Sequence, residues 1–336
     1  MRIAIITDAW HPQRNGVVRV LDTLADRLRR RTHHVEVFEP SAHPTIPCPS
    51  YPEIPLAVLP GRRLAQALDR YGPDAVHVAT EGPLGLAARR WCLDHSVPFT
   101  SAFHTRFPHY VQARLGIPLS WSYALIRRFH APAAHVMCPS PSVYRDLTQW
   151  GFKNAVEWSH GVDTDVFHPQ DKDFLDLPRP IFMYVGRVAV EKNLPAFVSL
   201  DFPGSKVVVG DGPARAGLIE RFPDTHWRIA NGDRELSRYF AAADCFVFPS
   251  RTDTFGLVML EALASGVPVA AFPVSGPLDV LDGKPVGVLS EDLKAAALDA
   301  LHIPPEACRN HAMGFSWDRV ADQFLSFLQP ARCPAA

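Results

Sequence analysis

No stretch of the 336-residue sequence approaches the ~20 consecutive apolar residues that a transmembrane helix needs. The amino terminus also lacks a basic segment and a cleavage site, because Met1 leads directly into an apolar run. These two absences predict a chain without a membrane span and without a secretory leader. We therefore expect a cytoplasmic protein, with peripheral attachment to the inner face of the membrane as a further option.

Paired cysteines and metal-binding motifs are missing as well. The six cysteines lie far apart and form no Cys-x-x-Cys pair, which argues for reduced thiols and against a zinc site or a disulfide scaffold. Asp163 and Asp165 form an Asp-x-Asp pair, and we interpret it as architectural because no His/Asp/Glu cluster accompanies it. We expect no metal ion and no cofactor.

The length of the chain predicts two domains. Short β-branched runs alternate with amphipathic stretches, which is typical of a parallel sheet covered by helices on both faces. A polar, proline-containing segment after His168 interrupts this pattern. We expect α/β domains at 1–168 and 169–312, each a Rossmann-like doubly wound sheet, facing each other across a ligand-binding cleft. A helix within 313–336 is expected to pack back toward the first domain.

The strongest motif runs from Ser250 to Glu261 (SRTDTFGLVMLE), follows a predicted strand at 245–248 and opens a helix at Leu257. A loop containing Gly256 lets backbone N–H groups approach a ligand, and the helix start adds more N–H groups and a positive dipole end. These features suit a diphosphate. Asp253 before the helix and Glu261 within it can accept hydrogen bonds from hydroxyl groups. The alternative is an N-capping Asp and a surface Glu on an ordinary helix.

This motif resembles the acidic-x7-acidic segment of retaining GT-B glycosyltransferases of family four, which includes lipid mannosyl- and glucosyltransferases. The resemblance implies that Asp253 contacts the sugar of the nucleotide-sugar, and that Glu261 binds its ribose. It also assigns the diphosphate to the segment Thr254, Phe255, Gly256, Leu257 and Val258. The commoner first acid in the family is Glu, so Asp253 leaves the identity of the sugar open.

Two further segments of the second half fit the same family. Gly186-Arg187 ends a predicted strand, and Lys192 follows in the next loop. Arg offers a planar fork and Lys a point charge to phosphate oxygens; the resemblance implies that both stabilise the departing diphosphate. Asp211-Gly212 resembles the family's Gly-Asp-Gly-Pro turn near the nucleotide, although by itself this sequence indicates only a turn.

In the first half, Asn15-Gly16 joins the first predicted strand to the first helix, and Gly16 can adopt φ > 0 while exposing N–H groups. The segment resembles the family's glycine loop facing the diphosphate. It is not Gly-x-Gly-x-x-Gly, which argues against an NAD-dependent oxidoreductase. His104 lies just beyond the predicted strand 99–102. The resemblance places it beside the transferred sugar as a catalytic residue, and the alternative is a structural histidine.

No acidic residue occurs between His95 and Arg145, where arginines alternate with aromatic residues. This composition suits docking at an anionic membrane surface. The alternative is that the aromatics belong to the core and the arginines to a solvated face. The candidates for acceptor or membrane contact are Arg106, Tyr110, Arg114, Trp121, Arg127 and Arg128.

Together these features predict a retaining hexosyltransferase that uses a nucleotide diphosphate-sugar, with a UDP-sugar favoured and GDP-mannose as the alternative. We expect a membrane lipid such as diacylglycerol as the acceptor. No carboxylate is placed as a nucleophile, which favours a front-face displacement over a double displacement. A nucleotide-sugar epimerase or hydrolase, or a non-catalytic nucleotide-sugar-binding module, remains the alternative. We expect no nucleic-acid partner, and the sequence leaves the oligomeric state open.

Overall fold

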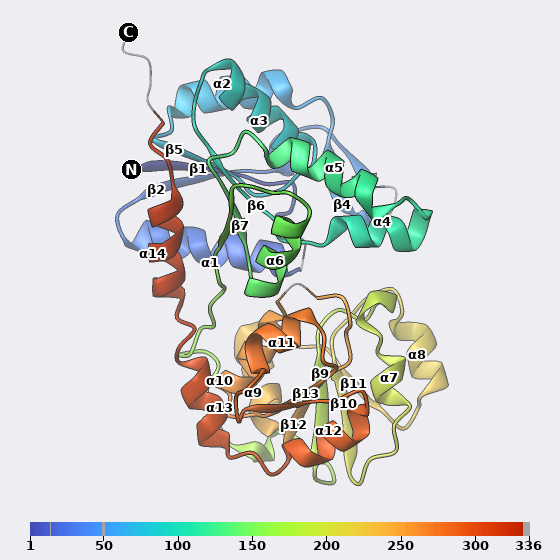
Figure 1. Ribbon diagram of the computed structural model, residues 1–336. Coiled ribbons are helices and arrows are strands. Elements are labelled where there is room, and N and C mark those ends of the chain that lie inside the picture. The colour runs from blue at the N-terminus through green and yellow to red at the C-terminus, as the bar shows by residue number, and fades with distance from the viewer. Residues whose placement is uncertain (14, 49–50, 254, 332–336) are drawn as a thin grey trace. The chain divides into compact units, whose positions relative to one another are not determined.

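The computed structural model describes residues 1–13, 15–48, 51–253 and 255–331 (Figure 1). They form two compact units: unit 1 comprises residues 1–159 with the chain from Trp317 onward, and unit 2 comprises residues 160–316. The first boundary therefore lies before the predicted position after His168. Its physical reason is that Val162 and Phe167 pack into the core of unit 2.

Unit 1 is built on a six-stranded parallel sheet with the strand order β2-β1-β5-β6-β7-β8 and a separate antiparallel β3–β4 pair. The strands are β1 Arg2–Ile6, β2 His34–Phe38, β3 Thr45–Cys48, β4 Tyr51–Ala57, β5 Ala75–Val78, β6 Thr100–Ala102, β7 His135–Cys138 and β8 Ala155–Glu157. The helices are α1 Gly16–Arg30, the 3-10 turn η1 Pro40–Ala42, α2 Gly61–Tyr71, α3 Pro83–Asp94, α4 Phe107–Leu115, α5 Leu119–His130, α6 Pro141–Gln149 and α14 Trp317–Phe327.

The carboxyl-terminal helix α14 is an integral part of unit 1. It packs beside α1 (Figure 1), and the indole N–H of buried Trp158 donates to the carbonyl of Val320 at 3.1 Å. At the end of α1, Arg31 forms an ion pair with Asp318 at 3.1 Å. Unit 1 is therefore made of two chain segments and unit 2 of one, and the chain passes between the units twice, near residues 160 and 316.

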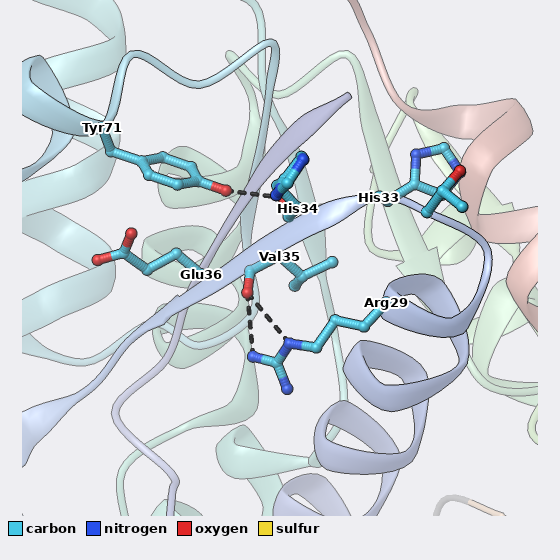
Figure 2. A pocket seen from close by; sticks show the side chains of 7 residues that line it. Arg29, His33, His34, Val35, Glu36 and Tyr71 are labelled. Atoms are coloured by element: carbon cyan, nitrogen blue, oxygen red, sulfur yellow. Dashed lines mark hydrogen bonds between the residues drawn. The ribbon is translucent and has the colours of Figure 1, made fainter.

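Strand β2 is the outer edge of the unit 1 sheet, and two side chains donate hydrogen bonds to its carbonyl groups (Figure 2). The guanidinium of Arg29 donates twice to the carbonyl of Val35, at 3.2 and 3.0 Å, and the Tyr71 hydroxyl donates to the carbonyl of His34 at 2.7 Å. A hollow of about 590 Å³ lies here, at the amino end of the strand. The backbone of His34 faces β1, and Tyr71 also donates to the carbonyl of Ile3 on β1 at 3.3 Å, whereas the carbonyl of Val35 faces outward. Ligands of doubly wound sheets bind at the carboxyl ends, so we interpret the Arg29 contact as protection of an exposed strand edge.

Unit 2 also contains a six-stranded parallel sheet, with the order β11-β10-β9-β12-β13-β14. The strands are β9 Ile181–Val185, β10 Ser205–Val209, β11 His226–Arg228, β12 Cys245–Phe248, β13 Val269–Ala271 and β14 Gly287–Leu289. The helical segments are η2 Lys172–Phe174, η3 Val190–Lys192, α7 Pro195–Val198, α8 Arg215–Arg221, α9 Asp233–Ala242, α10 Leu257–Ala264, α11 Ser275–Leu281, α12 Leu293–Ala300 and α13 Pro305–Ala312.

The strands of unit 2 are buried on both faces. In β9, Met183 packs into the core that contains α9, α10 and α13, whereas its neighbours Phe182 and Tyr184 pack into the core that contains α7 and α12. Successive side chains of a strand point to opposite faces, so a continuous apolar run such as Ile181–Val185 requires helices on both sides. The predicted α/β class of unit 2 follows directly from this pattern.

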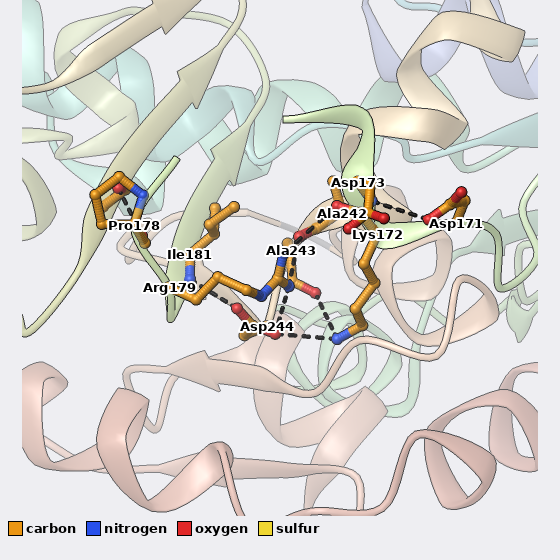
Figure 3. A network of polar contacts seen from close by, with 10 residues as sticks. Asp171, Lys172, Asp173, Pro178, Arg179, Ile181, Ala242, Ala243 and Asp244 are labelled. Atoms are coloured by element: carbon orange, nitrogen blue, oxygen red, sulfur yellow. Dashed lines mark hydrogen bonds and ion pairs between the residues drawn. The ribbon is translucent and has the colours of Figure 1, made fainter. Parts of the chain in front are cut away.

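The segment before β9 is held to unit 2 by the carboxylate of Asp244 (Figure 3). It accepts hydrogen bonds from Lys172 Nζ at 3.0 Å, from the Arg179 guanidinium at 2.6 Å and from the backbone N–H of Ile181 at 2.8 Å. These contacts lower the pKa of Asp244 against the opposing effect of its burial. The polar segment after His168, which interrupts the sequence pattern, is therefore an ordered part of unit 2 that Asp244 holds in place.

Candidate functional site

Each sheet has one point where the strand order reverses direction. In unit 1 it lies between β1 and β5, and in unit 2 it lies between β9 and β12. Doubly wound sheets bind ligands outside the carboxyl ends of the strands at this switch point. In unit 2 the loops after β9 and β12 carry the predicted Arg187, Lys192 and Asp253. The structure thus gathers these predicted residues at the switch point of their own unit.

The two switch-point loops of unit 2 are fastened to each other. The side-chain amide of Asn193, a residue with φ of 53°, donates to the carbonyl of Pro249 at 3.1 Å. Lys192 Nζ forms an ion pair with Asp253, and the two side chains are only 22% and 17% exposed. The second oxygen of Asp253, Oδ2, is buried and has no hydrogen-bond partner among the residues that the structure describes. A buried carboxylate oxygen in this state suits a ligand that supplies a hydroxyl group.

A pair of glycine turns supports the loop after β9. A Cβ atom on Gly210 would lie 1.9 Å from the carbonyl oxygen of Gly186, and one on Gly212 would lie 2.4 Å from that of Val188. The backbone N–H of Val188 donates to the carbonyl of Asp211 at 2.9 Å. The Asp211 carboxylate accepts from the N–H of Gly212 at 2.8 Å, so in this structure the Gly-Asp-Gly-Pro segment is a turn that positions the neighbouring loop.

The half-buried Arg187 follows β9, and its carbonyl accepts a hydrogen bond from the Tyr184 hydroxyl at 2.9 Å. Burial raises the pKa of Tyr184 well above its usual value, and the charges of Asp253 and Glu191 act in the same direction. The phenol therefore keeps its proton and remains a hydrogen-bond donor, which holds the backbone at Arg187 in place.

Helix α10 begins at Leu257 directly after Gly256, which has φ of 84° and serves as the N-cap. Of the side chains described here, none caps this helix start, so its first N–H groups and the positive end of its dipole suit an anion. Phe255 is buried against the ring of His160 at 5.2 Å, which leaves its backbone rather than its side chain for a ligand. Glu261 lies on α10 and is also buried. Thr254 lies outside the described residues.

In unit 1, Asn15 acts as the N-cap of α1, and its side-chain oxygen accepts from the N–H of Val18 at 3.0 Å. Gly16 is the first residue of this helix. The capacity of Gly16 for φ > 0 is therefore not used here, because a residue inside a right-handed helix has negative φ. The helix start itself lies at the carboxyl end of β1, as the sequence predicts.

His104 follows β6 and packs edge-to-face on buried Trp158, with 6.0 Å between the ring centroids. Burial lowers the pKa of His104 to about 4, and the negative charge of Glu81 opposes this shift. The imidazole is therefore neutral near pH 7 and suits hydrogen bonding with hydroxyl groups rather than charge neutralisation. His77 in β5 is fully buried, and its Nδ1 is hydrogen-bonded to Thr100 Oγ1 at 2.9 Å. Burial lowers the pKa of His77 to about 3.

The structure adds two carboxylates at this edge that the sequence did not single out. Asp8 follows β1 and accepts from Thr80 Oγ1 at 2.7 Å and from the N–H of Leu84 at 2.8 Å, which caps α3. Burial raises its pKa. Glu81 follows β5 and lies 3.1 Å from Nε2 of buried His130. The only sequence signal for either residue is an acid placed shortly after an apolar run.

The candidate membrane residues separate into two groups. Arg106 forms an ion pair with Asp146 at 2.7 Å and its side chain is only 13% exposed, while Arg127 is exposed and donates to the carbonyl of Trp150 at 3.0 Å. Trp121 and Arg128 are exposed on α5. The side chains of the remaining candidates, Tyr110 and Arg114, lie outside the described residues.

Helix α5 exposes apolar groups on one face and buries them on the other. Trp121 and Leu125, one turn apart, are 74% and 69% exposed, whereas Tyr123 and Ile126 are buried. Helix α4 lies next to α5 (Figure 1). Its residues Phe107 and Leu115 are exposed as well. We call this surface the α4–α5 face and define it by Phe107, Leu115, Trp121, Leu125 and Arg128.

Within the described ranges, no group of three His, Cys, Asp or Glu side chains is arranged to hold a metal ion. The Asp163 carboxylate instead accepts from the backbone N–H groups of Asp165 and Val166, at 3.1 and 3.2 Å, which is an architectural role. Among the helices described, none has the length and apolar character needed to cross a bilayer.

Residues 14–166 match the family described as Glycosyltransferase Family 4, and residues 179–302 match the family described as Glycosyl transferases group 1. A GDP-mannose-dependent alpha-mannosyltransferase of Mycobacterium tuberculosis (strain CDC 1551 / Oshkosh) is 30% identical over 369 residues, which cover 99% of this chain and 97% of that protein. The chain belongs to glycosyltransferase family 4. The resemblance inferred from the sequence is thereby confirmed.

Two further similarities bear on this family-four enzyme. An alpha-monoglucosyldiacylglycerol synthase of Streptococcus pneumoniae is 29% identical and covers 91% of this chain and 79% of its own length. The structure of sucrose-phosphate synthase from Thermosynechococcus elongatus superposes with a TM-score of 0.77 at 21% identity, covering 97% of both chains. This likeness supports the fold alone and confirms the predicted GT-B class, with two parallel-sheet α/β domains.

Proposed function

We propose that this family-four glycosyltransferase is a retaining mannosyltransferase that uses GDP-mannose and a membrane lipid acceptor. The observation that carries the proposal is the Lys192–Asp253 pair together with the start of α10, where the N-cap residue Gly256 supplies no side-chain cap, at the switch point of unit 2. It offers a cation and helix N–H groups for a diphosphate, and a carboxylate for a sugar hydroxyl. The sequence favours a UDP-sugar; the GDP-mannose dependence of a relative similar over the whole chain shifts our proposal.

The proposed reaction uses these groups in two ways. The acceptor oxygen forms a bond to the anomeric carbon while the bond from that carbon to the diphosphate oxygen breaks, and the acceptor proton passes to the departing diphosphate. Arg187, Lys192 and the first N–H groups of α10 stabilise the charge that develops on the leaving group. Asp253 holds the sugar and Glu261 the ribose.

Two observations support retention: the similar mannosyltransferase is named for an alpha-linked product, and the carboxylate of Asp253 in this site is paired with a lysine. An alpha-mannoside formed from GDP-mannose, an α-linked sugar nucleotide, keeps its configuration. In unit 2, Asp253 is already engaged by Lys192, which makes it a poor attacking nucleophile. Front-face displacement therefore suits this arrangement better than the covalent intermediate of retaining glycosidases.

The α4–α5 face supports a lipid acceptor. Its exposed aromatic and aliphatic groups lie one helical turn apart on α5, with Arg128 following on the same side of the helix. Apolar insertion combined with cations is the pattern of interfacial binding to anionic lipids. Arg106, bound to Asp146, is left out of this face. A relative that is a monoglucosyldiacylglycerol synthase makes diacylglycerol-type lipids the first acceptors to test.

A panel of sugar nucleotides tests the proposal. The purified enzyme is incubated with GDP-mannose, UDP-glucose or UDP-galactose, each with and without vesicles that contain diacylglycerol or phosphatidylinositol, and nucleotide release is measured. We expect GDP release from GDP-mannose, stimulated by lipid, and an α-linked mannolipid by NMR. Release that is indifferent to every lipid, or a β-linked product, contradicts the proposal. Turnover of a UDP-sugar alone overturns the choice of both nucleotide and sugar, and leaves only the glycosyl transfer to lipid in place.

A further inference from the structure

A buried hydrogen-bonded chain ends on Glu81 at the carboxyl edge of the unit 1 sheet. Ser101 Oγ lies 2.8 Å from His130 Nδ1, and His130 Nε2 lies 3.1 Å from Glu81 Oε1. Ser101 and His130 are fully buried, whereas the Glu81 side chain is 25% exposed. This series of hydrogen bonds therefore connects the interior of unit 1 with a carboxylate that solvent or a ligand can reach.

The register of the sheet places Glu81 beside His104. Strands β5 and β6 are parallel neighbours in which Val78 pairs with Ser101. Glu81 and His104 each lie three residues beyond this pair, at the same carboxyl edge. The negative charge of Glu81 also acts on the His104 imidazole. In addition, β5 is one of the two strands that flank the unit 1 switch point, where ligands bind in such sheets.

The hydrogen bonds define the tautomer of His130. An ionised carboxylate can only accept hydrogen bonds, so the proton lies on Nε2 and is donated to Glu81. In the neutral ring Nδ1 then accepts from the Ser101 hydroxyl. In this arrangement both ring nitrogens of His130 and the Ser101 hydroxyl have hydrogen-bond partners, and the His130 Nε2–H holds the Glu81 carboxylate in one position.

The loop that carries Glu81 is fixed on both sides. Thr80 donates its hydroxyl to Asp8 at 2.7 Å, and a Cβ atom on Gly82 would lie 2.4 Å from the Asp8 carboxyl carbon. On the far side, a Cβ on Gly85 would lie 1.8 Å from the carbonyl oxygen of Thr80. The backbone at Glu81 therefore has little freedom, which suits a side chain that must be presented accurately.

A purely structural role explains Asp8 better than Glu81. Asp8 is only 5% exposed, and its two oxygens accept from Thr80, Leu84 and Gly85. The corresponding structural role for Glu81 would be to anchor the end of α5 through His130. That end is already held, because Asn154 donates to the carbonyl of His130 at 3.1 Å and Arg89 donates to that of Phe129 at 2.8 Å.

We propose that Glu81 is a further catalytic residue, whose carboxylate accepts a hydrogen bond from a hydroxyl group at the point of transfer, and that His130 is its positioning residue. This role rests on the proposed function. The hydroxyl belongs either to the acceptor, as the group that attacks, or to the sugar being transferred. In both cases Glu81 orients the hydroxyl, while the acceptor proton still leaves with the diphosphate.

The first test compares Glu81→Gln with wild type, using the sugar nucleotide and lipid vesicle that give the highest turnover. The Gln oxygen still accepts from His130, so the shape of the site is kept and only the charge is lost. Since a hydrogen bond to a charged group is replaced by a neutral one, kcat should fall by about 10- to 100-fold with an unchanged melting temperature. Glu36→Gln, an exposed carboxylate within β2, is the matched control and should keep wild-type kcat.

Two assays identify the source of the hydroxyl. If Glu81 binds the acceptor, Glu81→Gln lowers lipid glycosylation and leaves the slow, lipid-independent release of nucleotide unchanged. If it binds the transferred sugar, both rates fall together. Wild-type kinetics for Glu81→Gln in both assays overturn the role of Glu81 and leave the proposed function intact. Absence of turnover by the wild-type enzyme with every sugar nucleotide overturns the proposed function, and the role of Glu81 with it.

A pair of His130 variants tests the positioning role. In His130→Gln the side-chain amide reaches Glu81 and should preserve most of kcat. In His130→Asn the shorter amide retains the Ser101 bond but does not reach Glu81, so kcat should fall toward the Glu81→Gln value. Both changes introduce an amide into the same buried site, so we expect similar melting temperatures. A difference in kcat between the two variants then reports on the contact with Glu81 and not on stability. Equal kcat values for the two variants contradict the positioning role of His130.

Discussion

The two units share one architecture but equip their switch points differently. In unit 2 the loops after β9 and β12 present opposite charges, Lys192 against Asp253, beside glycine-rich backbone. In unit 1 the loops after β5 and β6 present a single acid and a neutral imidazole, Glu81 and His104, above a buried polar interior. Unit 2 is thus suited to a charged diphosphate, and unit 1 to neutral hydroxyl groups.

The largest effect should come from removing the cation of unit 2. Lys192→Gln takes away one group that stabilises the leaving diphosphate, and comparable losses at other enzymes cost about 10²- to 10³-fold in kcat. Steady-state nucleotide release measures this effect, and thermal unfolding shows whether the fold is kept. Lys284→Gln, which changes an exposed lysine of the same unit, is the control. If Lys192→Gln and Lys284→Gln release nucleotide at similar rates, Lys192 does not stabilise the leaving diphosphate and the proposed difference between the units is wrong.

The glycine support of unit 2 should be the next most sensitive feature. Gly210→Ala places a Cβ 1.9 Å from the carbonyl oxygen of Gly186, so the loop before Arg187 must move. Overpacking of this kind costs about 1–3 kcal/mol of unfolding free energy, and we expect weaker GDP binding as well. Gly217→Ala in α8 meets nothing within 4 Å and should be neutral or stabilising. Urea unfolding and GDP titration distinguish the two. A harmless Gly210→Ala contradicts the supporting role.

The buried histidines of unit 1 predict a pH dependence of stability. The folded-state pKa of His77 is about 3, below the ordinary value near 6.5, so the unfolded chain binds more protons below pH 6.5. Stability is therefore complete above that pH and decreases as the pH falls, by about 2 kcal/mol for His77 between pH 7 and pH 5. Urea unfolding at both pH values measures it. His77→Gln should flatten this dependence, and His302→Gln, at an exposed site, should not. Equal slopes in all three proteins contradict the prediction.

The smallest expected effect concerns the α4–α5 face. Trp121→Ser and Leu125→Ser remove exposed apolar groups without touching the switch points. Loss of a partly inserted side chain should weaken partitioning onto anionic vesicles by about 10-fold, given transfer free energies of about 1.5–3 kcal/mol per large apolar group. Sedimentation with phosphatidylglycerol vesicles measures binding. Activity on a water-soluble acceptor serves as the control and should be unchanged. If the wild-type enzyme does not sediment with these vesicles, the membrane interpretation is wrong.

The sequence predicts the motif positions well because they are local. Helix α10 follows a strand and begins after Gly256, and its glycine and apolar pattern is contained in a short segment. Helix α5 is harder to predict from periodicity, since Trp121 and Leu125 are apolar on the exposed face and Tyr123 and Ile126 on the buried one. With apolar groups on both faces, the helical pattern disappears.

Contacts between distant segments account for what the sequence could not predict. The acid-free stretch ends at Arg145, and the next residue, Asp146, is the partner of Arg106. Glu81 and His130 are separated by 49 positions and meet only through the sheet register and the end of α5. Single residues of this kind carry no local signal, so their pairing becomes visible only in the folded chain.

The central claim is that unit 2 divides its ligand between Lys192, which binds the diphosphate, and Asp253, which binds the sugar. Calorimetric titration of GDP and GDP-mannose into wild type and Asp253→Asn tests it most directly. The wild-type enzyme should bind GDP-mannose more tightly than GDP. In Asp253→Asn that preference should vanish, while GDP affinity is kept or increased because Lys192 loses its competing partner. An unchanged preference for GDP-mannose in Asp253→Asn would contradict the account.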